Sequence, residues 1–555
     1  MSTIAETVLV CLSVLADSRG DIQTILNQAS ASAADAGETG YPLLMHIGVC
    51  QAKAGERSAA ATTFDRCRQG VLRMQDEHAK QWGLAQLAEA CAKAGEWDGA
   101  LRTVREIAHP DTEAYARYLV VAAQAEAGQI RRALATADCI NPRATGWKTS
   151  ALADVAIAEG NAGDFDAAKR TAKSIDVIAC NEKDDRASIV ANRDYALRNI
   201  AVAQAKSRKT KESVSTVEMI SKDVCRMQTL REMATIRAEA GDFDGARGAL
   251  EDALRIAKSV HANDQVCVIA RYQAAIGDIA GARQTIGAVA AGPEKGCALL
   301  AIAAAQTKAG DQDGATSMFH EGLRLIRAGN MESLGDVLQE LSKTLASAGN
   351  LKGALEVVGA IPNHLVQACA LHFIAVHEFK SGNASRALQI ANGIDDPSQK
   401  ALALLDIAIA QNKRETGAAE AAFQKALQAA GAIGIGGGTD VITFYEIGRA
   451  QARAGNVVAA AATFQQARHR AMQYTEESYV AQLLRDIASA QADGGDVEGA
   501  FAWATAITSP LQRGNALLGV VLGILRRGGG SGAFPKHSGV PGTRYLIHDT
   551  PSRIQ

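Results

Sequence analysis

Apolar and polar positions follow the period of an amphipathic helix along most of this chain, and each such stretch ends in the same kind of turn. Residues 299–306 (LLAIAAAQ) place apolar side chains at spacings of three and four, which predicts a helix with a buried face. Gly310 follows it, because glycine adopts the left-handed conformation common after a helix end. Asp311 is a good N-cap for the next helix. Residues 306–319 therefore predict a helix end, a tight turn and a new helix.

The same turn recurs along the chain, and a small residue follows each glycine at a fixed distance. The glycines are Gly55, Gly95, Gly128, Gly163, Gly241, Gly277, Gly310, Gly349, Gly382, Gly455 and Gly495. Alanine lies five residues later, at Ala60, Ala100, Ala133, Ala168, Ala246, Ala282, Ala315, Ala354, Ala387, Ala460 and Ala500. Two further units lack the glycine: one has Arg208 there, and the other, near Arg414 and Glu415, is one residue short. Because a pair of short helices cannot bury its apolar face alone, about 13 units must stack on one another.

The spacing of the turns predicts two classes of second helix. Four units carry Ala-x3-Phe after the turn, at Ala60/Phe64, Ala315/Phe319, Ala419/Phe423 and Ala460/Phe464, and each is followed by one of the longer gaps. We expect the other units to end sooner. Many of them reach a proline, which stops a helix: Pro110, Pro142, Pro293, Pro362, Pro397 and Pro510.

The unit resembles the tetratricopeptide repeat (TPR) through the Ala-x3-Phe signature and small first-helix residues such as Ala303, over residues 41–527. It departs from that family by lacking the first-helix Trp and Tyr. Glutamine holds the Tyr place in eight units: Gln51, Gln124, Gln204, Gln273, Gln306, Gln411, Gln451 and Gln491. A HEAT-type or other α-solenoid remains an alternative. The resemblance implies an all-α, right-handed superhelix of stacked antiparallel helix pairs.

Three regions follow from the pattern. Residues 1–40 are expected to form an N-terminal helical cap with a turn at Gly20-Asp21. Residues 41–527 form the solenoid, in which an apolar final helix at 511–527 covers the open end. Residues 528–555 begin with GGGSG and have no periodicity, so we expect a disordered tail; a peptide ligand for another protein is the alternative.

Composition narrows the function classes. The net charge of −2 argues against broad nucleic-acid binding, which needs a basic footprint. Ten cysteines without a Cys-x-x-Cys pair are typical of a reduced, cytoplasmic protein. The apolar run at 8–16 lacks a basic flank, so neither a signal peptide nor a membrane span is predicted. Abundant Ala, Gly and Arg are typical of a GC-rich bacterium.

Candidate catalytic and ligand-binding motifs are each better explained by structure. The GxGxxG-like string at 431–438 joins two predicted helices, whereas a phosphate loop needs a preceding strand. His364, His372 and His377 lack the i, i+4 spacing of a helical metal site. Asp184-Asp185 and Asp395-Asp396 are adjacent in sequence and are expected to point apart as solvated acids. The glutamines are expected to hydrogen-bond between neighbouring units. No enzyme, cofactor or metal site is predicted.

Function is expected in the concave groove, which the TPR resemblance lines with first-helix residues 13, 10, 6, 3 and 2 before each turn. The candidate groove residues are Tyr115, Tyr118, Tyr195, Arg198, Arg231, Arg271, Lys343, His372, Tyr445, Arg449 and Arg485. Their basic and aromatic character predicts a scaffold for a protein or peptide partner, with an acidic segment as the suggested ligand. The alternatives are a solvated face of mixed charge, a sensor arm acting in trans with a transcription or signalling partner, and an enzyme built on the solenoid.

Overall fold

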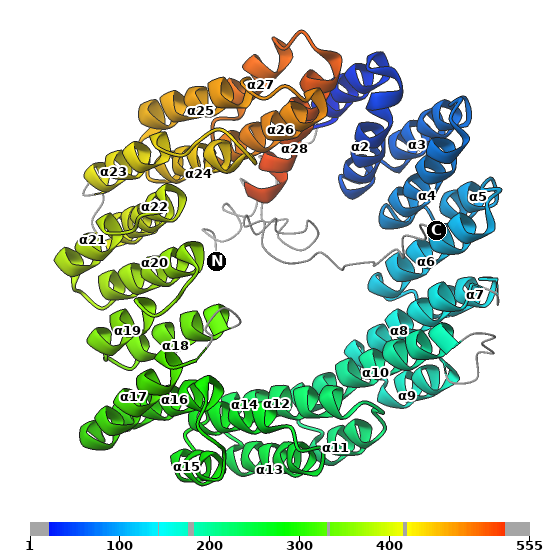
Figure 1. The fold of residues 1–555 in the computed structure, drawn as a ribbon. Coiled ribbons are helices and arrows are strands. Elements are labelled where there is room, and N and C mark those ends of the chain that lie inside the picture. Colours follow the sequence, from blue (N-terminus) through cyan, green and yellow to red (C-terminus); the bar gives the residue numbers. More distant parts are fainter. Residues whose placement is uncertain (1–21, 142–143, 176–182, 330–333, 415–418, 528–555) are drawn as a thin grey trace, which may run out of the picture.

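The computed structural model describes residues 22–141, 144–175, 183–329, 334–414 and 419–527. Its regular elements in these ranges are all helical, as predicted, and they form an α-solenoid of antiparallel pairs. The pairs are arranged as a ring in which the first helix of each pair lies inside and the second lies outside (Figure 1). The predicted tail at 528–555 and the predicted turn at Gly20-Asp21 lie outside the described residues.

Thirteen inner helices precede the turns. They are α2 (Tyr41–Lys53), α4 (Glu77–Lys93), α6 (Pro110–Glu126), α8 (Thr145–Asn161), α10 (Lys183–Lys206), α12 (Asp223–Glu239), α14 (Asn263–Ala275), α16 (Pro293–Ala309), α18 (Gly335–Ser347), α20 (His364–Lys380), α22 (Pro397–Arg414), α24 (Thr439–Arg453) and α26 (Glu477–Gly494). Proline is the first residue of α6, α16 and α22, because its fixed φ suits that position and it lacks only an N–H that would stay unpaired.

Thirteen outer helices follow the turns. They are α3 (Arg57–Leu72), α5 (Trp97–Val104), α7 (Ile130–Asp138), α9 (Phe165–Ser174), α11 (Thr210–Glu218), α13 (Phe243–Ser259), α15 (Ile279–Gly287), α17 (Gln312–Arg327), α19 (Leu351–Val358), α21 (Ala384–Asn392), α23 (Glu420–Gly431), α25 (Val457–Ala471) and α27 (Val497–Thr505). A last inner helix, α28 (Pro510–Arg527), ends the described chain.

The turn chemistry matches the sequence pattern. All eleven turn glycines have positive φ, between 72° and 112°, and Arg208 adopts φ 59° in the unit that lacks glycine. The carboxylates of the five predicted capping residues each accept a hydrogen bond from the backbone N–H three residues later: Asp164, Asp242, Asp278, Asp311 and Asp496. The eleven alanines are all at most 3 % exposed, so each lies at the contact between paired helices.

The two classes of outer helix are present, with one exception. Phe64, Phe319, Phe423 and Phe464 are buried on α3, α17, α23 and α25, which are 16, 16, 12 and 15 residues long. The expectation that units without this phenylalanine end sooner is wrong for α13, which has 17 residues. Leu250 is fully buried there, so leucine fills the same core position.

The two ends of the solenoid meet, and the ring is closed. Arg513 Nε of α28 donates a hydrogen bond to Ser32 Oγ at 2.9 Å, and its Nη2 lies 3.9 Å from Asp35 Oδ2. At Gly514 an added Cβ would lie 2.7 Å from Leu43 Cδ2 of α2 and 3.3 Å from Ala29 O. Buried residues of both ends belong to one hydrophobic core. The expectation that the final helix covers an open end is therefore wrong.

Residues from opposite ends of the chain complete a further helix pair. Residues 22–35 are helical and lie in the outer layer beside α28, while α28 continues the inner layer between α26 and α2 (Figure 1). Leu26, Ala29 and Ala33 of the first segment are fully buried, as are Ala516, Val520 and Val521 of α28. The apolar character of α28, which looked excessive for a cap, is explained because both of its sides are covered.

Candidate site on the inner face of the ring

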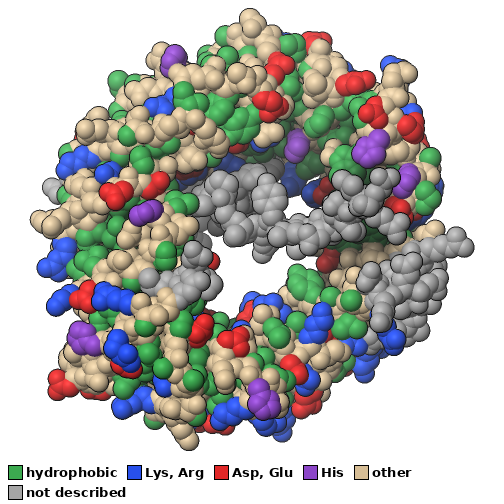
Figure 2. All heavy atoms as spheres, in the orientation of Figure 1, with side chains coloured by type: hydrophobic (Ala, Val, Ile, Leu, Met, Phe, Trp, Pro, Cys, Tyr) green, Lys and Arg blue, Asp and Glu red, His purple; other side chains and the backbone are tan. Residues whose placement is uncertain are grey.

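The inner helices surround a central opening and present one solvent-facing stripe each (Figures 1 and 2). On α4 this stripe contains His78, Trp82, Gln86 and Lys93, which are all exposed, at spacings of three to four residues or their multiple. On α6 and α8 the equivalent positions hold Tyr115, Tyr118 and Trp147, which are half-buried. Stripe residues of adjacent helices can therefore form a continuous surface.

Four aromatic rings of α4, α6 and α8 make contact across this surface, and we call them the aromatic patch: Trp82, Tyr115, Tyr118 and Trp147. Trp82 stacks on Tyr115 with centroids 5.4 Å apart and planes 6° apart. Trp147 lies 4.7 Å from Tyr115 and 5.5 Å from Tyr118. Trp82 is 47 % exposed although aromatic residues make up only 4 % of the chain. An exposed cluster in so aromatic-poor a protein marks a binding site more readily than a packing defect.

Carboxylates flank the aromatic patch. Burial raises the pKa of Tyr118 to about 12, and the charge of Asp154 on α8, with a hydrogen bond between the two side chains, adds to the shift. Burial also raises the pKa of Asp154. Glu89 on α4 contributes to the raised pKa of Tyr115 after burial, and Lys93 opposes it. Lys93 pairs with Glu89 at 2.5 Å, so Asp154 is the carboxylate that keeps its charge beside the rings without a cation.

Two members of the aromatic patch were missed by sequence reasoning. Trp82 lies 13 residues before Gly95, a position already assigned to the groove, so the repeat register could have found it. Trp147 lies 16 residues before Gly163, one helical turn beyond the positions considered. Tyr195 of α10, which was predicted, is 53 % exposed and close enough to Tyr118 to raise its pKa slightly.

Most predicted cationic groove residues are paired with acids. The pairs are Arg198 with Glu232 at 3.0 Å, Lys343 with Glu340 at 2.8 Å, His372 with Asp406 at 2.9 Å, Arg449 with Glu446 and Asp493, and Arg485 with Asp486 at 3.5 Å. Tyr445 is mostly buried, which raises its pKa with help from Asp486 and Glu446. These residues are spread over helices from α10 to α26 and do not form a single site.

Arg198, Arg231 and Arg271 follow one another on α10, α12 and α14, and we call them the basic arc. Arg231 Nη1 donates to Gln265 Oε1 at 2.7 Å, and its guanidinium lies 5.5 Å from the Tyr272 ring centre. Burial lowers the pKa of Arg231, and Arg271 and Arg198 lower it further. Within the described ranges Arg271 makes no ion pair, so the arc retains positive potential.

The glycine-rich string is held as a structural loop. Tyr474 Oη accepts hydrogen bonds from the backbone N–H groups of Gly436 and Gly438 and donates to the buried Asp440 at 2.6 Å. Arg470 donates to the carbonyl oxygens of Ile433 and Gly431. The N–H groups that a phosphate would need are therefore occupied by tyrosine.

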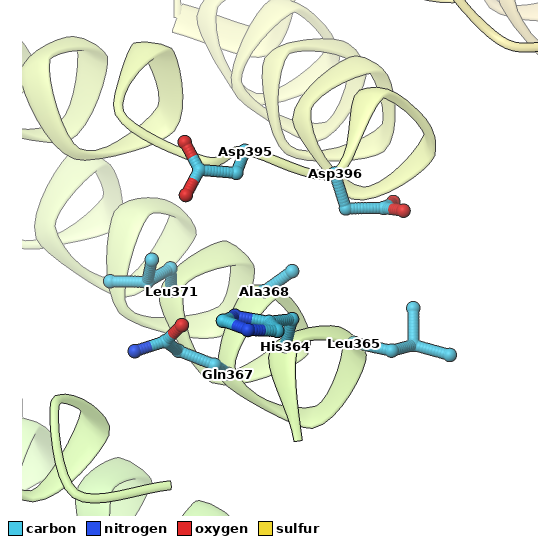
Figure 3. A pocket seen from close by; sticks show the side chains of 7 residues that line it. All are labelled: His364, Leu365, Gln367, Ala368, Leu371, Asp395 and Asp396. Atoms are coloured by element: carbon cyan, nitrogen blue, oxygen red, sulfur yellow. The ribbon is translucent and has the colours of Figure 1, made fainter. Parts of the chain in front are cut away.

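The three predicted histidines have separate surroundings. His372 faces Asp406, and His377 stacks on Phe373 at 6.2 Å. His364 lines a small cavity of about 190 Å³ with Leu365, Gln367, Ala368, Leu371, Asp395 and Asp396 (Figure 3). Asp395 and Asp396 point in different directions there, as expected (Figure 3), and Asp396 accepts from the Gln399 N–H at 2.8 Å. Asp184 and Asp185 lie on α10, and their side chains are outside the described part.

The buried glutamines bond mainly within their own unit. Thr63 donates to Gln51, Thr216 to Gln204 and Thr463 to Gln451, each from the outer to the inner helix of one pair. Gln491 accepts from Trp503 at 2.9 Å in the same way. The predicted bonds between units are wrong for these residues, apart from that of Arg468 to Gln491. The short second helix brings its Thr opposite the glutamine of its partner.

Two searches of the described residues bear on other site classes. No group of three or more His, Cys, Asp or Glu side chains in these ranges has the arrangement of a metal site. None of the helices described here combines the length and the hydropathy needed to cross a bilayer.

Comparisons with known proteins give only distant structural similarity. No family model and no curated protein matches the chain. Ton1535 from Thermococcus onnurineus NA1 is 15 % identical with a TM-score of 0.23, covering 58 % of this chain and 98 % of that one. A chain of the APC/C hetero-tetramer Cut9-Hcn1 is 14 % identical with a TM-score of 0.20, covering 90 % and 99 %. A circular tandem repeat protein is 12 % identical with a TM-score of 0.15, covering 93 % and 98 %.

Proposed function

We propose that this protein is a non-enzymatic scaffold that holds a polypeptide segment along the inner face of the ring, anchored on the aromatic patch. The observation that carries the proposal is the exposure of four touching rings on three successive inner helices. Tryptophan and tyrosine dominate binding energy at protein interfaces, because they bury a large area and lose little conformational freedom.

A polypeptide suits this surface better than a nucleic acid. Glu89 and Asp154 beside the rings oppose the approach of phosphates, and the net charge of −2 offers no broad basic footprint. Stripes on stacked inner helices favour an extended segment, which can contact several units in turn. The acidic ligand suggested by the sequence has support in the basic arc alone, because the other predicted cations are mostly paired.

The test is affinity capture from the native host with quantitative mass spectrometry. The bait is the full chain, the Trp82→Ala/Trp147→Ala variant, and Phe243→Ala as a matched control on the outer helix α13, where Phe243 is 55 % exposed. We expect the double variant to lose specific partners that the control retains. Equal recovery by all three proteins would overturn the proposal.

A third variant separates the aromatic patch from the basic arc. Arg198→Glu, Arg231→Glu and Arg271→Glu together reverse the charge of the arc and leave the rings in place. If this variant loses the partners and the tryptophan variant keeps them, the acidic-segment prediction replaces the aromatic anchor.

A further inference from the structure

The aromatic patch has both of the features that select one type of side chain. Trp82 and Tyr115 are nearly parallel, so together they offer flat faces rather than ring edges. A planar cation positioned over such a face is attracted by the ring quadrupole, and Trp and Tyr attract it best. Tyr118 and Trp147, also stacked, extend the surface toward α8.

Asp154 supplies an acceptor at the edge of these rings. It is partly removed from water, and its hydrogen bond with Tyr118 uses one of the several lone-pair sites of a carboxylate. Its neighbour Glu89 is occupied by Lys93. A partner that donates to Asp154 would therefore stabilise an incompletely satisfied charge.

Among protein side chains, arginine meets both requirements at once. Its guanidinium is planar, stacks on aromatic faces and forms two parallel hydrogen bonds with a carboxylate. Lysine presents a compact, strongly hydrated charge that stacks less well. Proline can cover the rings but leaves Asp154 without a donor, and acidic side chains are repelled by it.

We propose that the aromatic patch binds an arginine side chain of an extended basic segment, stacked on the Trp and Tyr faces with Asp154 accepting its N–H groups. This rests on the proposed function, since it names the chemistry of the segment that the inner face holds. The basic arc on α10 to α14 then sets the polarity of the bound segment, because it repels the basic end and attracts an acidic one.

The experiment measures binding of three fluorescent peptides to the purified full chain by anisotropy. The peptides are Arg-Gly repeats, Lys-Gly repeats and citrulline-Gly repeats, the last being neutral but similar in shape to arginine. The proteins are the wild type, Asp154→Asn, Trp82→Ala/Trp147→Ala, and Asp166→Asn as a control on the outer helix α9, where the carboxylate is 82 % exposed.

We expect the Arg peptide to bind several-fold more tightly than the Lys peptide and the citrulline peptide to bind weakest. Asp154→Asn should weaken the Arg peptide about tenfold, which corresponds to losing one hydrogen bond to a charged group, and Asp166→Asn should leave it unchanged. Equal affinities for the Arg and citrulline peptides, or equal effects of the two Asp variants, would overturn the inference.

The two proposals can fail separately. If host partners are lost with the tryptophan variant but the Arg preference is absent, the scaffold stands and the arginine assignment falls. If no host partner depends on the tryptophans, the scaffold proposal falls regardless of the peptide result.

Discussion

Arg513 donates a hydrogen bond to Ser32, a residue 481 positions earlier in the chain, and this contact joins the last helix of the solenoid to the first described one. It lies beside Gly514, where the helices come so close that a Cβ would contact Leu43 of α2 at 2.7 Å. The pair of residues 22–35 and α28 is therefore built from both ends of the sequence. The shape of the whole ring depends on how tightly this seam packs.

Gly514→Leu should open the ring. The added side chain has no space between α28, residues 22–35 and α2, and overpacking of this kind costs about 1–3 kcal/mol. We expect a larger radius of gyration in small-angle X-ray scattering and a lower denaturation midpoint. Gly287→Leu is the control, because Gly287 is exposed at the end of α15 with nothing within 4 Å of its Cβ position. An unchanged radius in both variants would show that the seam does not hold the ring.

Arg208→Gly should stabilise the protein. Arg208 adopts φ 59°, and a left-handed conformation costs a residue with a Cβ roughly 1–2 kcal/mol. Glycine removes this cost, although its greater freedom in the unfolded chain offsets part of the gain. Urea denaturation should show a rise of up to about 1 kcal/mol. The reverse change, Gly310→Ala at φ 87°, should lower stability by about 1 kcal/mol; a fall in the first variant would contradict this account of the turn.

Thr216→Val should cost more than Thr285→Val. Thr216 donates to the buried Gln204 at 2.8 Å, so valine leaves the amide oxygen without its donor, at about 1–3 kcal/mol. Thr285 is equally placed on α15, but Gln273 Oε1 has no hydrogen-bond partner in the described structure, so little is lost. Thermal denaturation of the two variants measures the difference. Equal shifts would mean that these amide bonds contribute nothing specific.

Tyr118 should ionise at about pH 12 and at a lower pH in Asp154→Asn. Burial is the largest cause of the raised pKa, and the Asp154 charge comes next, so the variant should shift the pKa down but not to the usual value near 10. Because the folded pKa is raised, the neutral phenol stabilises the fold below about pH 10, and this contribution is lost as the pH rises toward 12.

Phenolate absorbance during alkaline titration follows this ionisation. Tyr118→Phe identifies the signal, because its absence removes the step that belongs to this residue. If Asp154→Asn titrates like the wild type, Asp154 does not act on Tyr118 and cannot be the charge beside the rings.

The repeat and its turns could be predicted because their causes are local. Gly310 needs a left-handed conformation, Asp311 caps the next helix, and Ala315 permits close approach; each depends on residues within one unit. Closure of the ring could not be predicted in this way. It depends on small rotations between successive pairs, which add up around the ring and leave no motif in any single unit.

The candidate site could be predicted in part. Register placed Tyr115, Tyr118 and Tyr195 on the inner stripe, and the structure brings the first two together. Trp147 became visible only through its contact with rings of the neighbouring helix, since a stripe defined within one helix says nothing of which stripes touch. The pairing of Arg198 with Glu232, 34 positions later, likewise needs the stacked geometry.

Site-specific photocrosslinking in the native host tests the central claim most directly. A photoreactive amino acid replaces Tyr195 on the inner face in one protein and Phe243 on the outer face in another, since both positions are more than half exposed. Tyr195 adjoins the aromatic patch without belonging to it, so its replacement leaves the rings intact. The account predicts one set of crosslinked polypeptides from position 195 that is absent from position 243. Crosslinks from the outer position alone, or the same products from both, would contradict it.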